Sequence, residues 1–228
     1  MKVLIVIAIS VALAAFLVWA SASIRSGVYL KALCRADTAQ RTVYLTFDDG
    51  PVSGRTGKVL DVLKRRNAAA LFFLTGENVG RNTDLAKRIV SEGYSVGIHS
   101  WGHRWTFPFY GLDRMCDDLY RCISELELLT GKDVRLFRPP FGVVNPVMAR
   151  AVKILNLKTV GWDVRSFDTV DLEKPGGREK VLARIMEKVR PGSVILLHDR
   201  LEGADELLDS LLDRLDGEDY RYDRPLIS

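Results

Sequence analysis

The sequence predicts an α/β fold in which parallel strands form a barrel, complete or incomplete, with an apolar helix outside it. Two observations lead to this prediction. Short runs rich in β-branched and aromatic residues alternate with helical patterns, and polar side chains gather directly after the strand-like runs. With 228 residues, of which 47% are hydrophobic, the chain can bury one sizeable core. On the alternation alone, an open doubly wound sheet is the alternative.

The first 23 residues differ in kind from the rest. After Lys2, the run 3–20 is apolar apart from Ser10, and small residues follow at 21–23. A signal peptide cleaved at the small residues and an uncleaved membrane anchor both fit this pattern. A buried core helix fits less well, because the run has no polar face to present to water. The length of the run favours the anchor over a typical signal core.

The basic residues beside this helix give a mixed indication of export. Arg25, Lys31 and Arg35 on its far side outnumber Lys2, against the trend that places positive residues on the cytoplasmic side. Large domains cross membranes regardless of that trend. We therefore expect an exported protein, which is membrane-anchored and faces the periplasm or the outside, or is secreted.

Residues 24–41 are expected to form a connector, and residues 42–228 a single folded domain. Strands are predicted at 43–47, 70–75, 94–98, 134–137, 159–162 and 193–197, with a weak last one at 220–222. Helices are predicted at 58–66, 84–92, 113–129, 145–155, 178–189 and 205–215. Gly131 marks the end of the longest helix, and the Asn145-Pro146 pair is expected to open the next one.

Polar residues fall at the carboxyl ends of the predicted strands. They are Asp48 and Asp49, His99 and His103, Arg138, Asp163 with Asp168 beyond it, and His198 with Asp199. In an α/β barrel all carboxyl ends open on one face, and that face holds the active site. The chain has three histidines, and each lies at such an end. We therefore expect these distant segments to meet at one site.

Two adjacent carboxylates and a histidine pair together predict a catalytic metal site. Asp48 and Asp49 repel each other unless a cation is near, although Asp-Gly-Pro is also good turn chemistry. His99 and His103 can share a metal if a turn brings them together, and surface exposure or aromatic packing is the alternative. Two imidazoles and one carboxylate leave coordination positions open, as in catalytic sites, and the second carboxylate stays free as a base.

Arg138 and His198 extend this predicted site. Arg138 precedes two prolines and is expected to fix a carboxylate, with a surface ion pair as the alternative. The rigid prolines would hold the next backbone N–H in place, where it could stabilise an oxyanion. His198 follows a buried run, so we expect its tip at the barrel mouth as a general acid. A hydrogen-bonded core histidine is the alternative.

Four motifs occur in a particular order along the chain: Thr46-Phe-Asp-Asp-Gly-Pro51, His99-Ser-Trp-Gly-His103, Arg138-Pro-Pro-Phe-Gly142 and Leu196-Leu-His198. This pattern resembles the polysaccharide deacetylase family, carbohydrate esterase family four, which shares the chitooligosaccharide-deacetylase homology domain. The resemblance covers residues 42–215. It implies a distorted (β/α) barrel of seven units and a divalent metal, commonly zinc.

The resemblance also implies a role for each motif residue. The implied metal ligands are Asp49, His99 and His103. The implied catalytic set is Asp48 as base, Arg138 holding that base, His198 as acid and Asp168 tuning that acid. The implied substrate contacts are the Phe141 N–H at the oxyanion and Leu196 in the acetyl pocket. Family members usually carry Trp after the tuning Asp, whereas Thr169 stands there in this chain. This departure removes a large apolar wall, and Asp163 stays a second candidate for the tuning role.

The implied activity is the metal-dependent removal of acetyl groups from N-acetylated sugars of a polymer or oligosaccharide, with peptidoglycan N-acetylglucosamine as the first expectation. The alternatives are an O-acetyl xylan esterase, a deacylase of small or lipid-linked sugars, and a metal-containing glycan-binding protein without turnover. The net charge of +4 comes without an arginine-rich strip interleaved with aromatics, so we expect no nucleic-acid partner. We expect a monomer that meets the membrane through its N-terminal segment.

Overall fold

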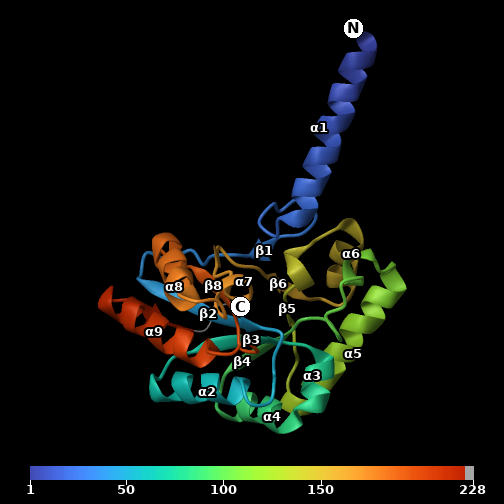
Figure 1. Ribbon diagram of the computed structural model, residues 1–228. Helices are drawn as coiled ribbons and strands as arrows, with labels where there is room; N and C mark the ends of the chain where they lie inside the picture. The colour runs from blue at the N-terminus through green and yellow to red at the C-terminus, as the bar shows by residue number, and fades with distance from the viewer. Residues whose placement is uncertain (224–228) are drawn as a thin grey trace.

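Figure 1 shows the computed structural model, in which a parallel sheet curls into an incomplete barrel with helices on its outer side. The structure describes residues 1–223. The sheet has the order β1-β6-β5-β4-β3-β2-β8-β7, and β9 pairs with β2. Neighbouring strands pair in parallel throughout this order. The predicted α/β barrel is therefore confirmed in its incomplete form.

The strands are β1 Ala32–Leu33, β2 Thr42–Asp48, β3 Ala70–Leu74, β4 Ser95–Ile98, β5 Leu136–Phe137, β6 Lys158–Val160, β7 Val164–Arg165, β8 Val194–His198 and β9 Arg221–Tyr222. The helices are α1 Lys2–Ala22, α2 Thr56–Arg65, α3 Gly76–Arg81, α4 Thr83–Ser91, α5 Leu112–Thr130, α6 Pro146–Ile154, α7 Asp168–Asp171, α8 Gly177–Lys188 and α9 Ala204–Gly217. Two short 3-10 helices are η1 Phe107–Phe109 and η2 Pro140–Gly142.

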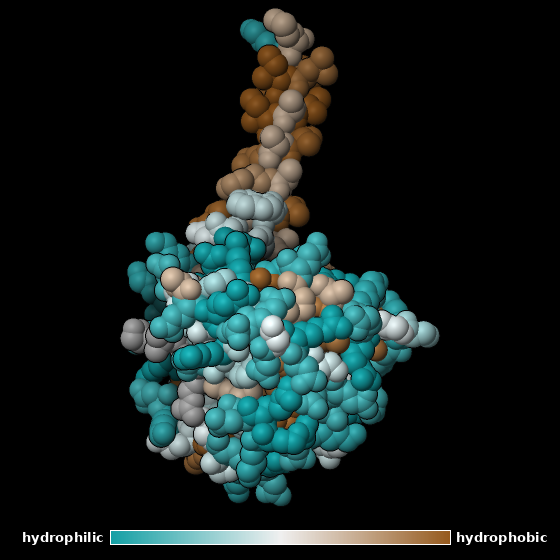
Figure 2. Space-filling view, turned by 90° about the vertical axis from the view of Figure 1, so that its left-hand side faces the viewer, coloured by the Kyte–Doolittle hydropathy of each residue, from teal (hydrophilic) through white to brown (hydrophobic). Residues whose placement is uncertain are grey.

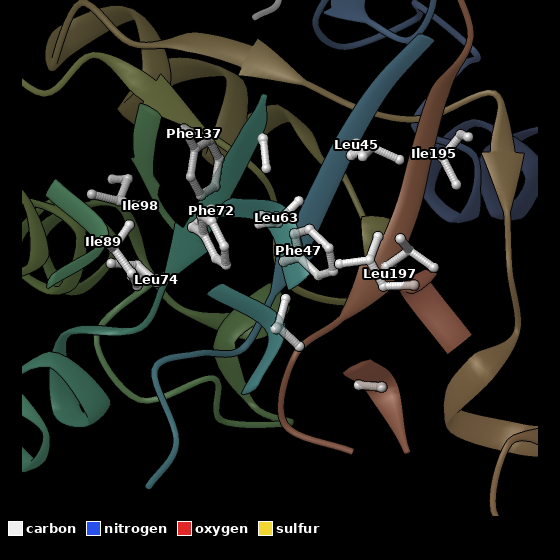
Figure 3. Close-up of a cluster of buried hydrophobic side chains, with 14 of the residues drawn as sticks. Leu45, Phe47, Leu63, Phe72, Leu74, Ile89, Ile98, Phe137, Ile195 and Leu197 are labelled. Carbon is white, nitrogen blue, oxygen red and sulfur yellow. The ribbon is translucent and has the colours of Figure 1, made fainter. Parts of the chain in front are cut away.

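The central strands β2 and β3 are buried on both faces, because helices cover the outside and side chains fill the inside. Leu45 and Phe47 belong to the outer core, where the Phe47 ring stacks on Phe72 with centroids 5.1 Å apart (Figure 3). A second cluster fills the interior: Tyr44, Leu71, Phe73, Val160 and Val194. The polar residues at the strand ends therefore lie next to an apolar barrel interior.

Two helix boundaries follow the predicted capping signals. Gly131 adopts φ 64 at the end of α5, a conformation that lacks strain only for glycine. At the start of α6, the Asn145 side chain accepts a hydrogen bond from the Met148 N–H at 2.8 Å, with Pro146 in the first turn. These caps fix where α5 ends and where α6 begins, and so they limit the chain segment between the two helices that leads to the site.

The stretch expected to be a connector enters the sheet. β1 pairs with β6, and Arg35 forms an antiparallel bridge with Ser193 just before β8. The Ala36 N–H also donates to the Gly192 carbonyl at 2.9 Å. Residues 32–36 therefore run between the two ends of the curled sheet, where a complete barrel would close.

The apolar helix α1 projects away from the barrel, as Figure 1 shows, and the prediction that it lies outside the barrel is confirmed. In the space-filling view it stands as an apolar rod on a mainly hydrophilic body (Figure 2). By length and composition it can cross a membrane.

Candidate active site

The carboxyl ends of the strands meet over a cavity of about 160 Å³. Its lining includes most of the sequence-predicted site residues: Asp48, Asp49, His99, His103, Phe141, Leu196 and His198. A larger hollow of about 530 Å³ lies at the opposite, amino-terminal ends of β4 and β6, beside Ser95 and Lys158. In parallel barrels the chemistry is located at the carboxyl ends, so the smaller cavity is the candidate site.

Asp49, His99 and His103 form a group that fits a divalent metal ion. Their nearest ligand atoms all lie within 4.8 Å of one another. Asp49 Oδ1 is 3.6 Å from His99 Nε2 and 3.5 Å from His103 Nε2. This oxygen is buried and, within residues 1–223, has no hydrogen-bond partner. A cation between the three side chains would satisfy it.

Backbone contacts hold the two histidines in place. His99 Nδ1 lies 2.7 Å from the Arg138 carbonyl oxygen, which leaves Nε2 directed at Asp49. The His103 N–H donates to Ser100 Oγ at 3.0 Å. Asp49, Ser100 and His103 all adopt positive φ, at 75°, 67° and 47°. Such conformations are unfavourable for non-glycine residues and persist where the surroundings impose them.

The electrostatics of the group favour the protonation states that bind a metal. Burial by itself raises the pKa of Asp49, but the three histidines and Arg200 outweigh it and lower the pKa to about 2. Burial, followed by the neighbouring His99, lowers the pKa of His103 to about 4. At neutral pH the Asp49 carboxylate is therefore charged and the His103 imidazole is neutral.

Asp48 is fixed by a buried arginine. Arg138 Nη1 donates to Asp48 Oδ1 at 2.7 Å and to Thr46 Oγ1 at 2.9 Å. Its other nitrogens donate to the carbonyls of Val160 and Gly161. Burial lowers the pKa of Arg138 and Asp48 opposes this effect, yet an arginine keeps its charge in proteins. The other oxygen, Asp48 Oδ2, faces the candidate metal ligands and lies 3.7 Å from His99 Nε2.

His198 is paired with Asp168. His198 Nδ1 lies 2.9 Å from Asp168 Oδ1, and the His198 N–H donates to Asp168 Oδ2 at 2.7 Å. Burial by itself lowers the pKa of His198, but the Asp168 hydrogen bond and the nearby carboxylates raise it above its ordinary value. Asp163 lies elsewhere, accepting hydrogen bonds from Ser193 Oγ and the Val194 N–H. The structure thus places Asp168, and not Asp163, against His198.

Aromatic side chains form walls of the cavity. Phe141 adopts φ 62, and its ring meets the His103 ring edge-on with centroids 4.5 Å apart. Trp162 lines the cavity and packs against Gly142, where an added Cβ would lie 2.5 Å from the indole. Thr169 lines the cavity as well. Trp162 therefore provides an aromatic wall in a site where Thr169 is small.

Sequence reasoning missed several residues of this site, among them Trp162, Arg165 and Arg200. Arg200 Nε donates to Asp49 Oδ2 at 2.7 Å, so the two carboxylate oxygens of Asp49 face different partners. The Asn78 amide also donates to the Asp49 carbonyl at 2.7 Å. The available signal for Arg200 was its place two residues after His198, just beyond a strand end.

Comparison with known proteins places these residues in a family context. The family model described as polysaccharide deacetylase matches residues 35–160. The chain is 33% identical to the peptidoglycan-N-acetylmuramic acid deacetylase PdaA of Bacillus subtilis, over 82% of this chain and 70% of that protein. It is also 33% identical to the peptidoglycan-N-acetylglucosamine deacetylase PgdA of Listeria monocytogenes, over 86% of this chain but 40% of that longer protein.

Solved structures show the same fold. The Bc1960 peptidoglycan N-acetylglucosamine deacetylase superposes with a TM-score of 0.77 at 28% identity, over 84% of this chain and 89% of that one. BA3943 of Bacillus anthracis, described as a CE4 family pseudoenzyme, superposes with a TM-score of 0.76 at 27% identity, over 84% of this chain and 66% of that one. A similar fold thus accompanies both an enzyme and a pseudoenzyme, so the side chains of the site decide the chemistry.

Proposed function

We propose, from the premise that this chain belongs to the polysaccharide deacetylase family, that it removes acetyl groups from N-acetylated sugars with the help of a bound divalent metal ion. As a member of that family the chain is a deacetylase, a hydrolase. The observation that carries the metal proposal is Asp49 Oδ1, which lies between two imidazoles, beside an arginine-held Asp48, and has no hydrogen-bond partner among the described residues 1–223. The relatives that act on peptidoglycan support peptidoglycan N-acetylglucosamine as the substrate.

Asp49, His99 and His103 would hold the ion. Two imidazole nitrogens and one carboxylate oxygen suit zinc, which takes three protein ligands in catalytic sites. When bound, the ion would lower the pKa of a water molecule and polarise the acyl carbonyl.

The other residues divide the proton transfers between them. Asp48 accepts the proton of the attacking water at Oδ2, because Oδ1 is already occupied by Arg138. The Phe141 N–H donates a hydrogen bond to the oxyanion that forms at the acetyl carbonyl. His198, kept protonated by Asp168, passes its proton to the departing nitrogen as acetate leaves. Leu196 lines the pocket for the acetyl methyl group.

The pairing of His198 with Asp168 favours an amide over an ester substrate. An amine is expelled from a tetrahedral intermediate only when it is protonated, whereas an alkoxide needs less assistance. The Asp168 hydrogen bond and the nearby carboxylates raise the pKa of His198 and so favour its protonated form. The His198–Asp168 pair therefore supports the hydrolysis of N-acetyl groups over that of O-acetyl groups on xylan. It also supports a catalytic protein over one that only binds a glycan.

We also propose that residues 1–23 direct export, that residues 24–41 join them to a catalytic domain of residues 42–228 and add β1 to its sheet, and that the protein acts outside the cytoplasmic membrane as a monomer. The relatives named as peptidoglycan deacetylases support action on the outer side of the membrane. The apolar composition of α1 supports a membrane segment.

Zinc titration of two variants tests the ligand assignment. His99→Ala removes a ligand, so we expect tight binding of zinc to be lost. Asp48→Asn should keep tight zinc binding, because Asp48 is the proposed base and not a ligand. Isothermal titration of the metal-free proteins measures both. A His99→Ala protein that bound one equivalent of zinc as tightly as the native chain would refute the ligand set.

A further inference from the structure

The base of α1 is part of the folded body. Ala20 is 0% exposed and Ile24 5% exposed, and Ile24 belongs to the main hydrophobic core. Ser26 Oγ donates to the Ala20 carbonyl at 2.9 Å, and the Val144 N–H donates to the Ser21 carbonyl at 2.9 Å. No flexible segment separates the end of the apolar helix from the barrel within these residues. Cleavage of the chain at the small residues 21–23 would remove the residues of α1 that take part in these contacts.

The contacts at the helix base reach the walls of the active site. Val144 lies three residues after Phe141, so its backbone is within about 10 Å of that cavity residue. Ile24 packs against Gly161, where an added Cβ would lie 3.2 Å from the Ile24 side chain. Gly161 precedes Trp162, another cavity residue. The helix base therefore abuts two segments that line the cavity.

Two exposed aromatic residues lie in a loop that is hydrogen-bonded to the segment contacting the helix base. Trp105 is 76% exposed and Phe109 79% exposed, in the loop that contains η1. The Asn145 amide donates to the Pro108 carbonyl at 2.7 Å, which joins this loop to the neighbour of Val144. Large aromatic side chains of this kind gather at the boundary between membrane and water.

The charge near the helix base also suits a bilayer surface. Directly beyond the helix, residues 24–31 carry Arg25 and Lys31 and no acidic residue. A net positive segment directly beyond a membrane helix is attracted to anionic lipid headgroups. The aromatic loop is thus linked to the helix base through Asn145 and Val144, and the basic residues Arg25 and Lys31 follow the helix directly. Figure 2 shows the apolar helix rising from the hydrophilic body.

We propose that α1 is retained as a membrane anchor and that, with loop 105–109 at the bilayer surface, it holds the active site beside the membrane, where the substrate is an N-acetylated saccharide linked to a lipid of that membrane. The inference rests on the proposed deacetylase function, and it names a lipid-linked N-acetylated saccharide as the substrate in place of the assembled peptidoglycan layer. A glycan layer separated from the membrane by water is reached through a flexible tether, and the docked base of α1 leaves no such tether before the barrel.

A linker insertion tests this arrangement in the full-length protein. A Gly-Ser linker of about 30 residues, with a root-mean-square span of roughly 30 Å, is inserted between Val18 and Trp19. This position leaves the docked residues 20–26 untouched. The protein is reconstituted in vesicles of phosphatidylcholine and phosphatidylglycerol that carry a dialkylglycerol with an N-acetylglucosaminyl headgroup. A water-soluble chitooligosaccharide is assayed in parallel.

We expect the linker variant to lose on the order of tenfold in its rate on the vesicle glycolipid, because the domain now spends most of its time away from the surface. Its rate on the chitooligosaccharide should be unchanged. The same linker placed between Lys132 and Asp133, in an exposed turn, is the matched control and should change neither rate. A double variant, Trp105→Ser with Phe109→Ser, should lower the glycolipid rate alone, since neither residue lines the cavity.

Equal rates of the Val18–Trp19 linker variant and the native chain on the vesicle glycolipid would overturn the inference. Recovery of a mature chain without α1, by intact-mass measurement, would overturn it as well. Activity on the chitooligosaccharide without activity on the glycolipid would overturn the inference and leave the proposed function standing. Inactivity of the native chain on both substrates would overturn the proposed function and the inference with it.

Discussion

Asp49 connects the two halves of the candidate site through its two oxygens. Oδ1 faces His99 and His103, and Oδ2 accepts the hydrogen bond of Arg200 Nε at 2.7 Å. Second partners of this kind orient metal ligands, and their loss weakens metal binding. Arg200 also brings a positive charge that opposes a bound cation. A test of its orienting role must therefore separate the hydrogen bond from the charge.

Two substitutions at Arg200 make that separation. Arg200→Gln removes the charge and keeps an N–H donor, whereas Arg200→Met removes both at similar length. We predict that the Met variant binds zinc roughly 10- to 100-fold more weakly than the Gln variant, because Asp49 is then free to rotate. Competition with a chromophoric chelator measures the two affinities. Equal affinities in the two variants would show that the hydrogen bond does not position Asp49.

Asp199 makes the stability of the protein depend on pH. It is fully buried and accepts a hydrogen bond from Thr56 Oγ1 at 2.5 Å, and burial raises its pKa to about 7. Between the ordinary pKa of an aspartate and this value, the folded state binds a proton that the unfolded state has released. Asp199 therefore lowers the stability of the fold as the pH rises through that range.

We predict that Asp199→Asn gains stability relative to the native chain as the pH rises from about 4 to about 8, by a few kcal/mol at most. Urea unfolding of the metal-free proteins across this range measures the difference. Metal-free protein is used so that zinc binding does not add its own pH dependence. A difference that stayed constant with pH would contradict the assignment of a raised pKa to Asp199.

The sequence was sufficient to place the polar residues at strand ends, and insufficient to choose between partners that depend on loop paths. Asp163 and Asp168 both follow the same predicted strand, and only the fold shows that Asp168 reaches His198. Arg200 belongs to no spacing pattern, because its partner Asp49 is 151 positions away. Such pairings are decided by tertiary structure and leave little trace in a single sequence.

At the scale of elements, α3 and the loop after β4 are locked together. Gly76 begins α3 and leaves space for the ring of Trp101, which an added Cβ would overlap. Trp101 lies between His99 and His103, and Arg121 stacks over its ring at 3.6 Å. The position of the histidine pair is therefore set partly by a glycine on a different element.

We predict that Gly76→Ala destabilises the protein by about 1–3 kcal/mol through overpacking, and weakens zinc binding by displacing the loop between the two histidines. Gly80→Ala on the same helix meets nothing within 4 Å and is the matched control. It should gain roughly 0.5–1 kcal/mol from its higher helix propensity. Thermal unfolding and zinc titration measure both variants. Equal behaviour of the two would rule out a packing role for Gly76.

The long elements could be predicted, whereas several of the short ones could not. Helices such as α5 and α9 show an apolar stripe of several turns, and β2, β3 and β8 show buried runs, so their patterns are legible. β1 and β7 have two residues each and α7 has four, too few to show any period. β1 forms because β6 offers an edge with which it can pair, and that edge cannot be recognised in the sequence of β1 itself.

At the scale of the whole molecule, the incomplete barrel explains both the site and the position of α1. The sheet ends at β1 and β7, and the chain between α1 and β2 passes across that opening. The catalytic face lies at the carboxyl ends of the strands, and the docked base of α1 adjoins its rim (Figure 1). A protein truncated at residue 41 would lose β1 and Ile24, so functional measurements need the full chain.

Acetate release by the full-length chain with zinc, compared with Asp48→Asn, tests the central claim most directly. The substrates are chitooligosaccharides, peptidoglycan fragments and acetylated xylan. We predict release from the N-acetylated substrates, and a loss of at least about 100-fold in the variant, which should bind zinc as tightly as the native chain. Undiminished release by Asp48→Asn, release from xylan alone, or no release from any substrate by the zinc-loaded native chain would contradict the claim.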